Sequence, residues 1–509
     1  MGLENILLGF SVAITPYNLG VAVIGILLGT IIGVLPGLGG ANGVAILLPL
    51  TFRMPPTSAI ILLTSLYWGA LFGGAITSVL FNIPGEPWSV ATTFDGYPLA
   101  RRGKSGEALT ASFTSSFVGA LFSTVLITLF APLLADVALR FGPPEFFAIQ
   151  LLTFSAFVGL GGGDPAKSLV SVVLGLLLAA VGLDTVTGHI RLTFGLTPLI
   201  PGFDFIVVVI GLFGLGEIFL SMEEGLKFEG AKAAMNLRVV LETWKGLPQY
   251  WRTFLRGCLI GFWMGFKPGG ATPASFMSYG FAKRFSKRGD NFGKGEIEGV
   301  VAPETAAHAA GVAAMLPMIT LGIPGSPTAA VMLGGLVIWG LQPGPMLFKE
   351  QPEFVWGLIA SMYTGNVIGV IMVLAFVPLF AAILRVPFAI LIPFIVVICG
   401  IGAYAAHGNM MDLVYLIPFG IIGYVFKKLN YPLAPLVLAL VLGDMAEAAF
   451  RQSLIMSQGT LLIFFRRPIS AVITAAAIVL FTYPLLASRW RRLRHGSLPI
   501  TPISGDSSS

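Results

Sequence analysis

The stretch 321-LGIPGSPTAA-330 lies within strongly apolar sequence, yet it places two glycines and two prolines within six consecutive residues. Proline interrupts a helix, and at membrane depth the freed backbone N–H and C=O groups find no water to bond. A second stretch, 81-FNIPGEPWSV-90, contains a similar break about 240 residues earlier. Either stretch alone predicts a kinked helix. Broken helices are also tolerated where they line a cavity, so the pair raises the alternative of a binding site.

The composition places the chain in a membrane. Hydrophobic residues make up 56% of the 509 positions and charged residues only 11%, with a mean hydropathy of +0.88. Soluble domains carry about a quarter charged residues, so we expect an all-α polytopic membrane protein embedded in the lipid bilayer. Cys258 and Cys399 lie in apolar runs and are expected to be buried free thiols.

Four features of the first half recur in the same order in the second half, which predicts an internal repeat. The members of each pair lie 230 to 249 positions apart, and the pairs are 33-GVLPGLGG-40 with 265-GFKPGGAT-272, 82-NIPGEP-87 with 322-GIPGSP-327, 111-ASFTSS-116 with 360-ASMYTG-365, and 214-GLGEIF-219 with 443-GDMAEAAF-450. The chain then divides into an N-terminal segment 1–17, a first repeat 18–222, a charged linker 223–252, a second repeat 253–450, a C-terminal helix region 451–488 and a basic and polar tail 489–509.

Basic residues predict that the two repeats have opposite orientations. The loop after the first Pro-Gly element holds only Arg53, whereas the equivalent loop of the second repeat holds Lys283, Arg284, Lys287, Arg288 and Lys294. The bias reverses after the second Pro-Gly element, where Lys349 of the second repeat corresponds to Arg101, Arg102 and Lys104 of the first. Because basic loops remain in the cytoplasm, equivalent loops lie on opposite sides. Such inverted-topology repeats are typical of secondary transporters.

The C-terminal run 489-RWRRLRH-495 directly follows an apolar segment and precedes a Ser-rich tail. This arrangement is typical of a cytoplasmic anchor at the membrane surface. We therefore expect a cytoplasmic C-terminus and no nucleic-acid partner.

Segment lengths indicate that some Pro-Gly elements are re-entrant hairpins. Between Arg256 and Lys283 lie 26 residues with Pro268 near the middle, so each arm spans about 18 Å against a hydrocarbon core of ~30 Å. The equivalent hairpin of the first repeat is residues 20–52. With the first apolar segment, about twelve transmembrane helices are expected, the others lying near 57–81, 106–131, 145–162, 167–183, 204–222, 303–321, 354–383, 386–404, 411–426, 433–449 and 469–487.

The Pro-Gly elements occur as two symmetry-related pairs, which favours a binding site over isolated kinks. We name them the first tip (36–40), second tip (82–87), third tip (267–272) and fourth tip (322–327). Half-helix N-termini at such tips expose N–H groups and the positive end of the helix dipole, which suits a carboxylate. The candidate substrate-binding residues are Pro36, Gly37, Gly39, Gly40, Asn42, Asn82, Pro84, Gly85, Lys267, Gly269, Gly270, Thr272, Gly325 and Ser326.

Charged residues near the tips leave several alternatives open. A lysine at membrane depth is unfavourable unless it is paired or functional, so Lys267 either contacts a carboxylate or neutralises a nearby glutamate. Glu86 is its partner, a proton carrier or a cation ligand. In 302-APETAAHAAG-311, Glu304 follows Pro303 and is expected at a helix N-terminus. The candidates for handling a coupling ion, Na⁺ or H⁺, are Glu86, Thr305 and His308, and a Na⁺ site near the tips is a further expectation.

His308 has two interpretations, because a membrane histidine is either a packed hydrogen-bonding residue or part of a proton relay. The stretch 161-GGGDPAKS-168 nearly matches a phosphate-binding loop, but Ala166 replaces its second glycine, so we expect no ATP-driven transport. A polytopic membrane enzyme is one alternative, but an intramembrane hydrolase needs paired aspartates that face each other, and the aspartates that could serve lie near predicted helix ends instead: Asp184, Asp204, Asp412 and Asp444. A gradient-independent channel is another, because a channel can share the hairpins.

Several stretches resemble the large membrane subunit of the tripartite tricarboxylate transporters, the TctA family. Besides 33-GVLPGLGG-40, they are 47-LLPLTF-52, 82-NIPGEPWSVATTFDGYPLARRGKSGEAL-109, 182-GLDTVTGHIRLTFG-195, 277-MSYGFAKRFSK-287, 293-GKGEIEGVVAPETAAHAAG-311 and 319-ITLGIPGSPTAAVMLGGL-336. The family usually has other residues at Glu86, Lys267 and Ala307-His308, so the resemblance does not fix which carboxylate is carried.

The resemblance implies a secondary transporter of the bacterial inner membrane, with no enzymatic activity and no cofactor beyond a coupling Na⁺ or H⁺. It would import a di- or tricarboxylate by symport and alternating access. Its implied partners are a small membrane subunit and a periplasmic substrate-binding protein. A homodimer of the large subunit is left open.

Overall fold

The computed structural model describes residues 3–35, 38–138, 141–160, 164–184, 188–224, 235–267, 269–383, 388–407 and 409–494. The first half of the chain contains α1 (Leu3–Ala13), α2 (Pro16–Val34), α3 (Gly39–Leu47), α4 (Pro56–Phe81), α5 (Val90–Arg101), α6 (Ser105–Ala138), α7 (Pro143–Leu160), α8 (Pro165–Ala179), α9 (Phe205–Val209), the π-helical turn η4 (Ile210–Leu215) and α10 (Gly216–Glu224). A two-stranded antiparallel hairpin, β1 (Gly182–Leu183) and β2 (Ile190–Arg191), lies between α8 and α9.

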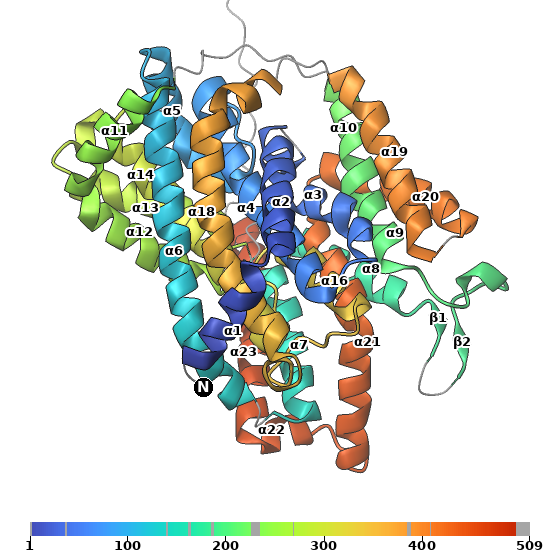
Figure 1. Ribbon diagram of the computed structural model, residues 1–509. Helices are drawn as coiled ribbons and strands as arrows, with labels where there is room; N and C mark the ends of the chain where they lie inside the picture. The colour runs from blue at the N-terminus through green and yellow to red at the C-terminus, as the bar shows by residue number, and fades with distance from the viewer. Residues whose placement is uncertain are drawn as a thin grey trace, which may run out of the picture.

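The second half continues with α11 (Leu237–Gly246), α12 (Trp251–Gly265), α13 (Ala271–Phe285), α14 (Glu298–Ala313), α15 (Met315–Leu321), α16 (Pro327–Ile338), α17 (Leu347–Glu350), α18 (Pro352–Ile383), α19 (Phe388–His407), α20 (Met410–Lys428), α21 (Leu433–Met456), α22 (Ile463–Arg466) and α23 (Pro468–Arg494). The long helices α6 and α18 lie side by side, with α12–α14 gathered on one side and α9, α10, α19 and α20 on the other (Figure 1). The all-α polytopic class is confirmed.

The predicted spans agree with the structure in most positions. Among the described residues, seven helices are long and apolar enough to cross a bilayer, and further apolar helices have shorter described stretches. The span expected at 303–321 is divided at Ala314 into α14 and α15. The helix α2, with 19 residues, is longer than the short hairpin arm expected there. The number of spans and the inverted orientation of the repeats stay predictions.

Glycine stripes bring two helix pairs into close backbone contact. On α2 and on α12, three glycines recur every fourth residue, and a Cβ atom on any of them would meet atoms of α4 or α14, respectively. Small residues at this spacing allow membrane helices to pack closely. The same packing occurs at positions that the predicted repeat makes equivalent: Gly25, Gly29 and Gly33 face Leu62, Leu66 and Ala70, and Gly257, Gly261 and Gly265 face Ala302, Ala306 and Ala310.

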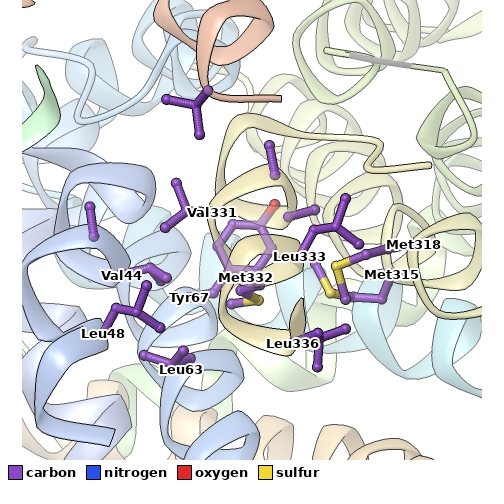
Figure 2. Close-up of a cluster of buried hydrophobic side chains, with 14 of the residues drawn as sticks. Val44, Leu48, Leu63, Tyr67, Met315, Met318, Val331, Met332, Leu333 and Leu336 are labelled. Atoms are coloured by element: carbon purple, nitrogen blue, oxygen red, sulfur yellow. The ribbon is translucent and has the colours of Figure 1, made fainter. Parts of the chain in front are cut away.

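The hydrophobic core lies between the helices that carry the tips. Val44 of α3 and Tyr67 of α4 pack with Met315 of α15 and Met332 of α16, all without measurable exposure (Figure 2). The two long helices are tied by Asn366, whose Nδ2 donates to the carbonyl of Phe117 at 3.0 Å. This core fixes the relative positions of the four tips.

Candidate functional site

A cavity of about 960 Å³ opens where the four tips meet. Every tip contributes to its wall, through Gly39 of the first, Glu86 of the second, Lys267, Gly269 and Thr272 of the third, and Gly325 and Ser326 of the fourth, together with Asn42 on α3. These residues come from both halves of the chain. Residues of all four tips therefore line one cavity, and its role as a substrate site stays a prediction.

The second and fourth tips have nearly the same backbone conformation. α4 ends at Asn82 (φ 58°, ψ 27°) and α15 ends at Gly322 (φ 71°, ψ 22°), both in the left-handed region that asparagine and glycine tolerate best. Four residues later, Glu86 (φ −142°, ψ 156°) and Ser326 (φ −148°, ψ 161°) are extended and begin the next helix. The helix break is thus the same structure built twice.

The tips are locked to the ends of neighbouring helices by close glycine contacts. A Cβ on Gly85 would lie 2.6 Å from the Cα of Gly74 and 2.8 Å from the carbonyl oxygen of Gly33. A Cβ on Gly325 would lie 2.5 Å from the carbonyl oxygen of Gly265. Neither position has room for a side chain, which explains why Pro-Gly recurs in both tips.

Glu86 occupies the helix end that was expected to bind an anion in the first repeat. Its Oε1 accepts a hydrogen bond of 2.5 Å from the N–H of Gly40, in the first turn of α3. A carboxylate is favoured there by the unpaired N–H groups and the helix dipole. The N-terminus of α3 is therefore satisfied by the protein itself, and Glu86 is not the ion-pair partner of Lys267.

The equivalent helix end in the second repeat lacks such a carboxylate. At the start of α13, Gly270 provides no side-chain cap, and Thr272 lies in the cavity wall. Ser326 does not reach this helix end, because its hydroxyl accepts from the N–H of Ala329 at 3.1 Å and caps α16. Lys267 lines the cavity beside this end and forms no ion pair with the described residues. The third tip therefore combines a helix N-terminus with a cation.

A buried ion pair in the cavity wall was not predicted. Lys427 of α20 donates to Glu217 Oε2 at 2.5 Å and to the carbonyl of Phe213 at 3.3 Å, and Asn42 Nδ2 lies 3.5 Å from the same glutamate oxygen. Glu217 follows the π-helical turn η4, and such turns are frequent at functional sites. The glutamate marked the repeat in the sequence, but Lys427 resembled an ordinary basic residue at the end of an apolar helix.

Several predicted site residues support the cavity without lining it. Gly40 holds Glu86, Gly85 packs on α2 and α4, and Asn82 ends α4. Pro84 belongs to the second tip, and a Cβ on Gly270 would meet the backbone of Met264. Pro36 and Gly37 lie outside the described residues, as does Pro268.

Thr305 and His308 lie away from the cavity. The Thr305 hydroxyl donates to the carbonyl of Val301 at 2.7 Å, and the His308 ring packs on Phe72 with centroids 5.3 Å apart. The expectation that Glu304 begins a helix is wrong, because α14 starts at Glu298 and continues through Pro303. Proline is tolerated there since it lies in the second turn of a helix whose neighbours surround it.

Known proteins agree with the resemblance drawn from the motifs. Residues 19–438 match the model of the tripartite tricarboxylate transporter TctA family. An Agrobacterium vitis protein, described as an uncharacterized 52.8 kDa protein in the TAR-I ttuC′ 3′ region, is 39% identical over 488 residues, covering 96% of this chain and 97% of that protein. A second protein of that organism, in the TAR-II ttuC′ 3′ region, is 39% identical over 232 residues, covering 46% of this chain and 95% of that protein. No solved structure matches the chain. The chain belongs to the tripartite tricarboxylate transporter TctA family.

Proposed function

We propose that the chain is the translocating subunit of an ion-gradient-driven carboxylate importer that works by alternating access in the bacterial inner membrane. The observation that carries the proposal is the third tip, where Lys267 and the N-terminus of α13 face one cavity with all three other tips. A cation and a helix N-terminus together recognise a carboxylate.

The cavity also suits a substrate with more than one polar group. Thr272 and Asn42 offer neutral hydrogen-bonding groups, and Lys427 supplies a second cation from α20. Glu217 and Glu86 keep the wall from becoming uniformly positive. Binding a cation together with the carboxylate lowers the electrostatic cost of moving either through lipid, so the proposal includes Na⁺ or H⁺ symport, with Glu86 at the cavity as one candidate for the coupling ion.

The partners and the motion belong to the proposal as well. A tripartite family favours two further components, a small membrane subunit and a periplasmic substrate-binding protein that delivers the carboxylate. The tip-bearing helices would move against the long helices α6 and α18, with the C-terminus in the cytoplasm.

Uptake into proteoliposomes tests the proposal. The full chain would be reconstituted with the small membrane subunit, and binding protein loaded with radiolabelled citrate or malate would be added outside. We expect accumulation only under an imposed Na⁺ or pH gradient. Absence of uptake under both gradients would contradict the coupled carrier, and rapid gradient-independent flux would indicate a channel instead.

A further inference from the structure

A buried carboxylate lies outside the cavity and has no role in the site described above. Glu304 on α14 is 3% exposed. Its Oε1 accepts from the hydroxyl of Thr92 on α5 at 2.6 Å, and its Oε2 accepts from the hydroxyl of Ser116 on α6 at 3.0 Å. Three helices from both halves of the chain therefore converge on one carboxyl group.

The polar groups around Glu304 do not balance a negative charge. The nearest basic group is His308, whose Nδ1 lies 3.6 Å from Glu304 Oε2 and 3.2 Å from the backbone oxygen of the same glutamate. The Nε2 atom of His308 is buried without a hydrogen-bond partner among the described residues. The buried hydroxyl of Ser112 is also near the carboxyl group of Glu304, but its geometry does not meet the criteria for a hydrogen bond. A buried carboxylate without a cation is strongly unfavourable, so the neutral carboxyl form fits this environment.

Other titratable groups around α14 do not supply the missing charge. No Lys or Arg of the described residues forms an ion pair with Glu304. Asp95 is already satisfied, because it accepts from the N–H groups of the loop before α14 and from the Tyr279 hydroxyl at 2.8 Å. The described parts of η2 (Pro87–Ser89) and α15 carry no titratable group. The other elements packed on α14 carry Tyr67 on α4; Asp95, Tyr97 and Arg101 on α5; Glu107 and Asp136 on α6; Arg252, Arg256 and Cys258 on α12; and Tyr279, Lys283 and Arg284 on α13, while α14 itself also has Glu298.

We propose that Glu304 and His308 form a proton-binding site, in which one proton from aqueous hydronium passes by way of the His308 imidazole to the Glu304 carboxylate and returns to water by the same route when the carboxyl group ionises. This inference rests on the proposed transport function, for which it assigns H⁺ as the coupling ion. Thr92 and Ser116 hydroxyls already occupy both carboxylate oxygens, which leaves little of the oxygen shell that a metal cation requires.

The position of this proton site links it to the cavity. Ala310 and Gly311 of α14 line the cavity wall. They follow Glu304 by six and seven residues, which is about 10 Å along a helix. His308 lies between Glu304 and Ala310 on the same helix. Gain or loss of a charge at Glu304 therefore acts on the helix that forms part of the substrate site.

Infrared spectroscopy tests the proton site independently of transport. Difference spectra between acidic and alkaline buffers, without Na⁺, would be recorded on the full chain in lipid. We expect a carboxylic-acid C=O band that disappears in Glu304→Gln and remains in Glu107→Gln. Glu107 is the control, because it lies on α6, which packs on α14, and it forms an ion pair with Lys104 at 3.1 Å. If Glu304→Gln does not fold, Thr92→Val should instead shift the band.

Two spectroscopic results would overturn the proposal. One is a band that is identical in the wild-type protein and in folded Glu304→Gln. The other is loss of the band when Na⁺ is added at constant pH, since this would show a metal cation at the site.

Transport adds a readout that separates this inference from the proposed function. In proteoliposomes, Glu304→Gln should retain citrate exchange at close to the wild-type rate and lose pH-driven citrate accumulation at least tenfold. Loss of exchange in a folded variant would overturn the inference. If the wild-type protein fails to accumulate citrate under either a Na⁺ or a pH gradient, the transport proposal fails. The infrared band still decides whether Glu304 binds a proton.

Discussion

The second and fourth tips have the same backbone but different chemistry. At matching positions the second tip has Glu86, which satisfies the N-terminus of α3, and the fourth has Ser326, which caps only its own helix, α16. A carboxylate side chain therefore binds the first turn of α3, whereas no side chain caps α13, which starts beside Lys267. The comparison teaches that two tips of matching backbone conformation can differ in chemistry through the single side chain at the position of Glu86 and Ser326.

The shared framework should be the most sensitive part of the comparison. Gly85→Leu and Gly325→Leu each force a side chain into backbone atoms less than 3 Å away. Overpacking of this kind costs about 1–3 kcal/mol or more, so we expect both variants to lose folded protein, measured as monodisperse yield and thermal midpoint in detergent. Gly280→Ala is the control, because a Cβ there meets nothing within 4 Å. Normal folding of both leucine variants would show that the tips are not locked.

Carboxylate binding at the start of α13 is expected to depend on Lys267. Lys267→Glu places a negative charge where the carboxylate would bind, and loss of a charge-assisted hydrogen bond alone costs about 1.5–3 kcal/mol. Citrate uptake should fall at least tenfold while the thermal midpoint stays close to that of the wild type. Lys349→Glu, at an exposed position of α17, is the matched control. Retained uptake in Lys267→Glu would remove the third tip from the site.

The difference between the two tips can be reversed directly. Ser326→Glu gives the fourth tip the carboxylate of the second, and the new side chain should compete with substrate at the start of α13. We expect KM for citrate to rise about tenfold in Ser326→Glu. It should rise by much less in Ser326→Gln, because glutamine has the size of glutamate without its charge. Equal effects of the two substitutions would indicate that size rather than charge matters at this position.

Much of this architecture was predictable, and the reasons are local. Hydropathy located the long helices, and Pro-Gly pairs located the tips, because both signals depend on residues that are neighbours in sequence. The break at Ala314 carries no glycine and was missed. The ion pair of Glu217 with Lys427 joins residues 210 positions apart, and the hydrogen bond of Glu86 with Gly40 joins residues 46 positions apart. Nothing in a single sequence specifies such partners.

The ends of α4 and α15 provide the finest test of how alike the two tips are. Asn82 and Gly322 have left-handed conformations that differ by only 13° in φ (58° against 71°) and 5° in ψ (27° against 22°). A residue with an ordinary side chain loses about 1–2 kcal/mol in this region. Asn82→Ala and Gly322→Ala should therefore lower the free energy of unfolding by similar amounts, about 1 kcal/mol, whereas Asn82→Gly should change it by less than about 0.5 kcal/mol. Denaturant midpoints of the purified protein would measure this. A large effect at one position only would show that the two helix ends are held by different interactions, and the backbone equivalence on which the exchange of Glu86 and Ser326 chemistry depends would then be lost.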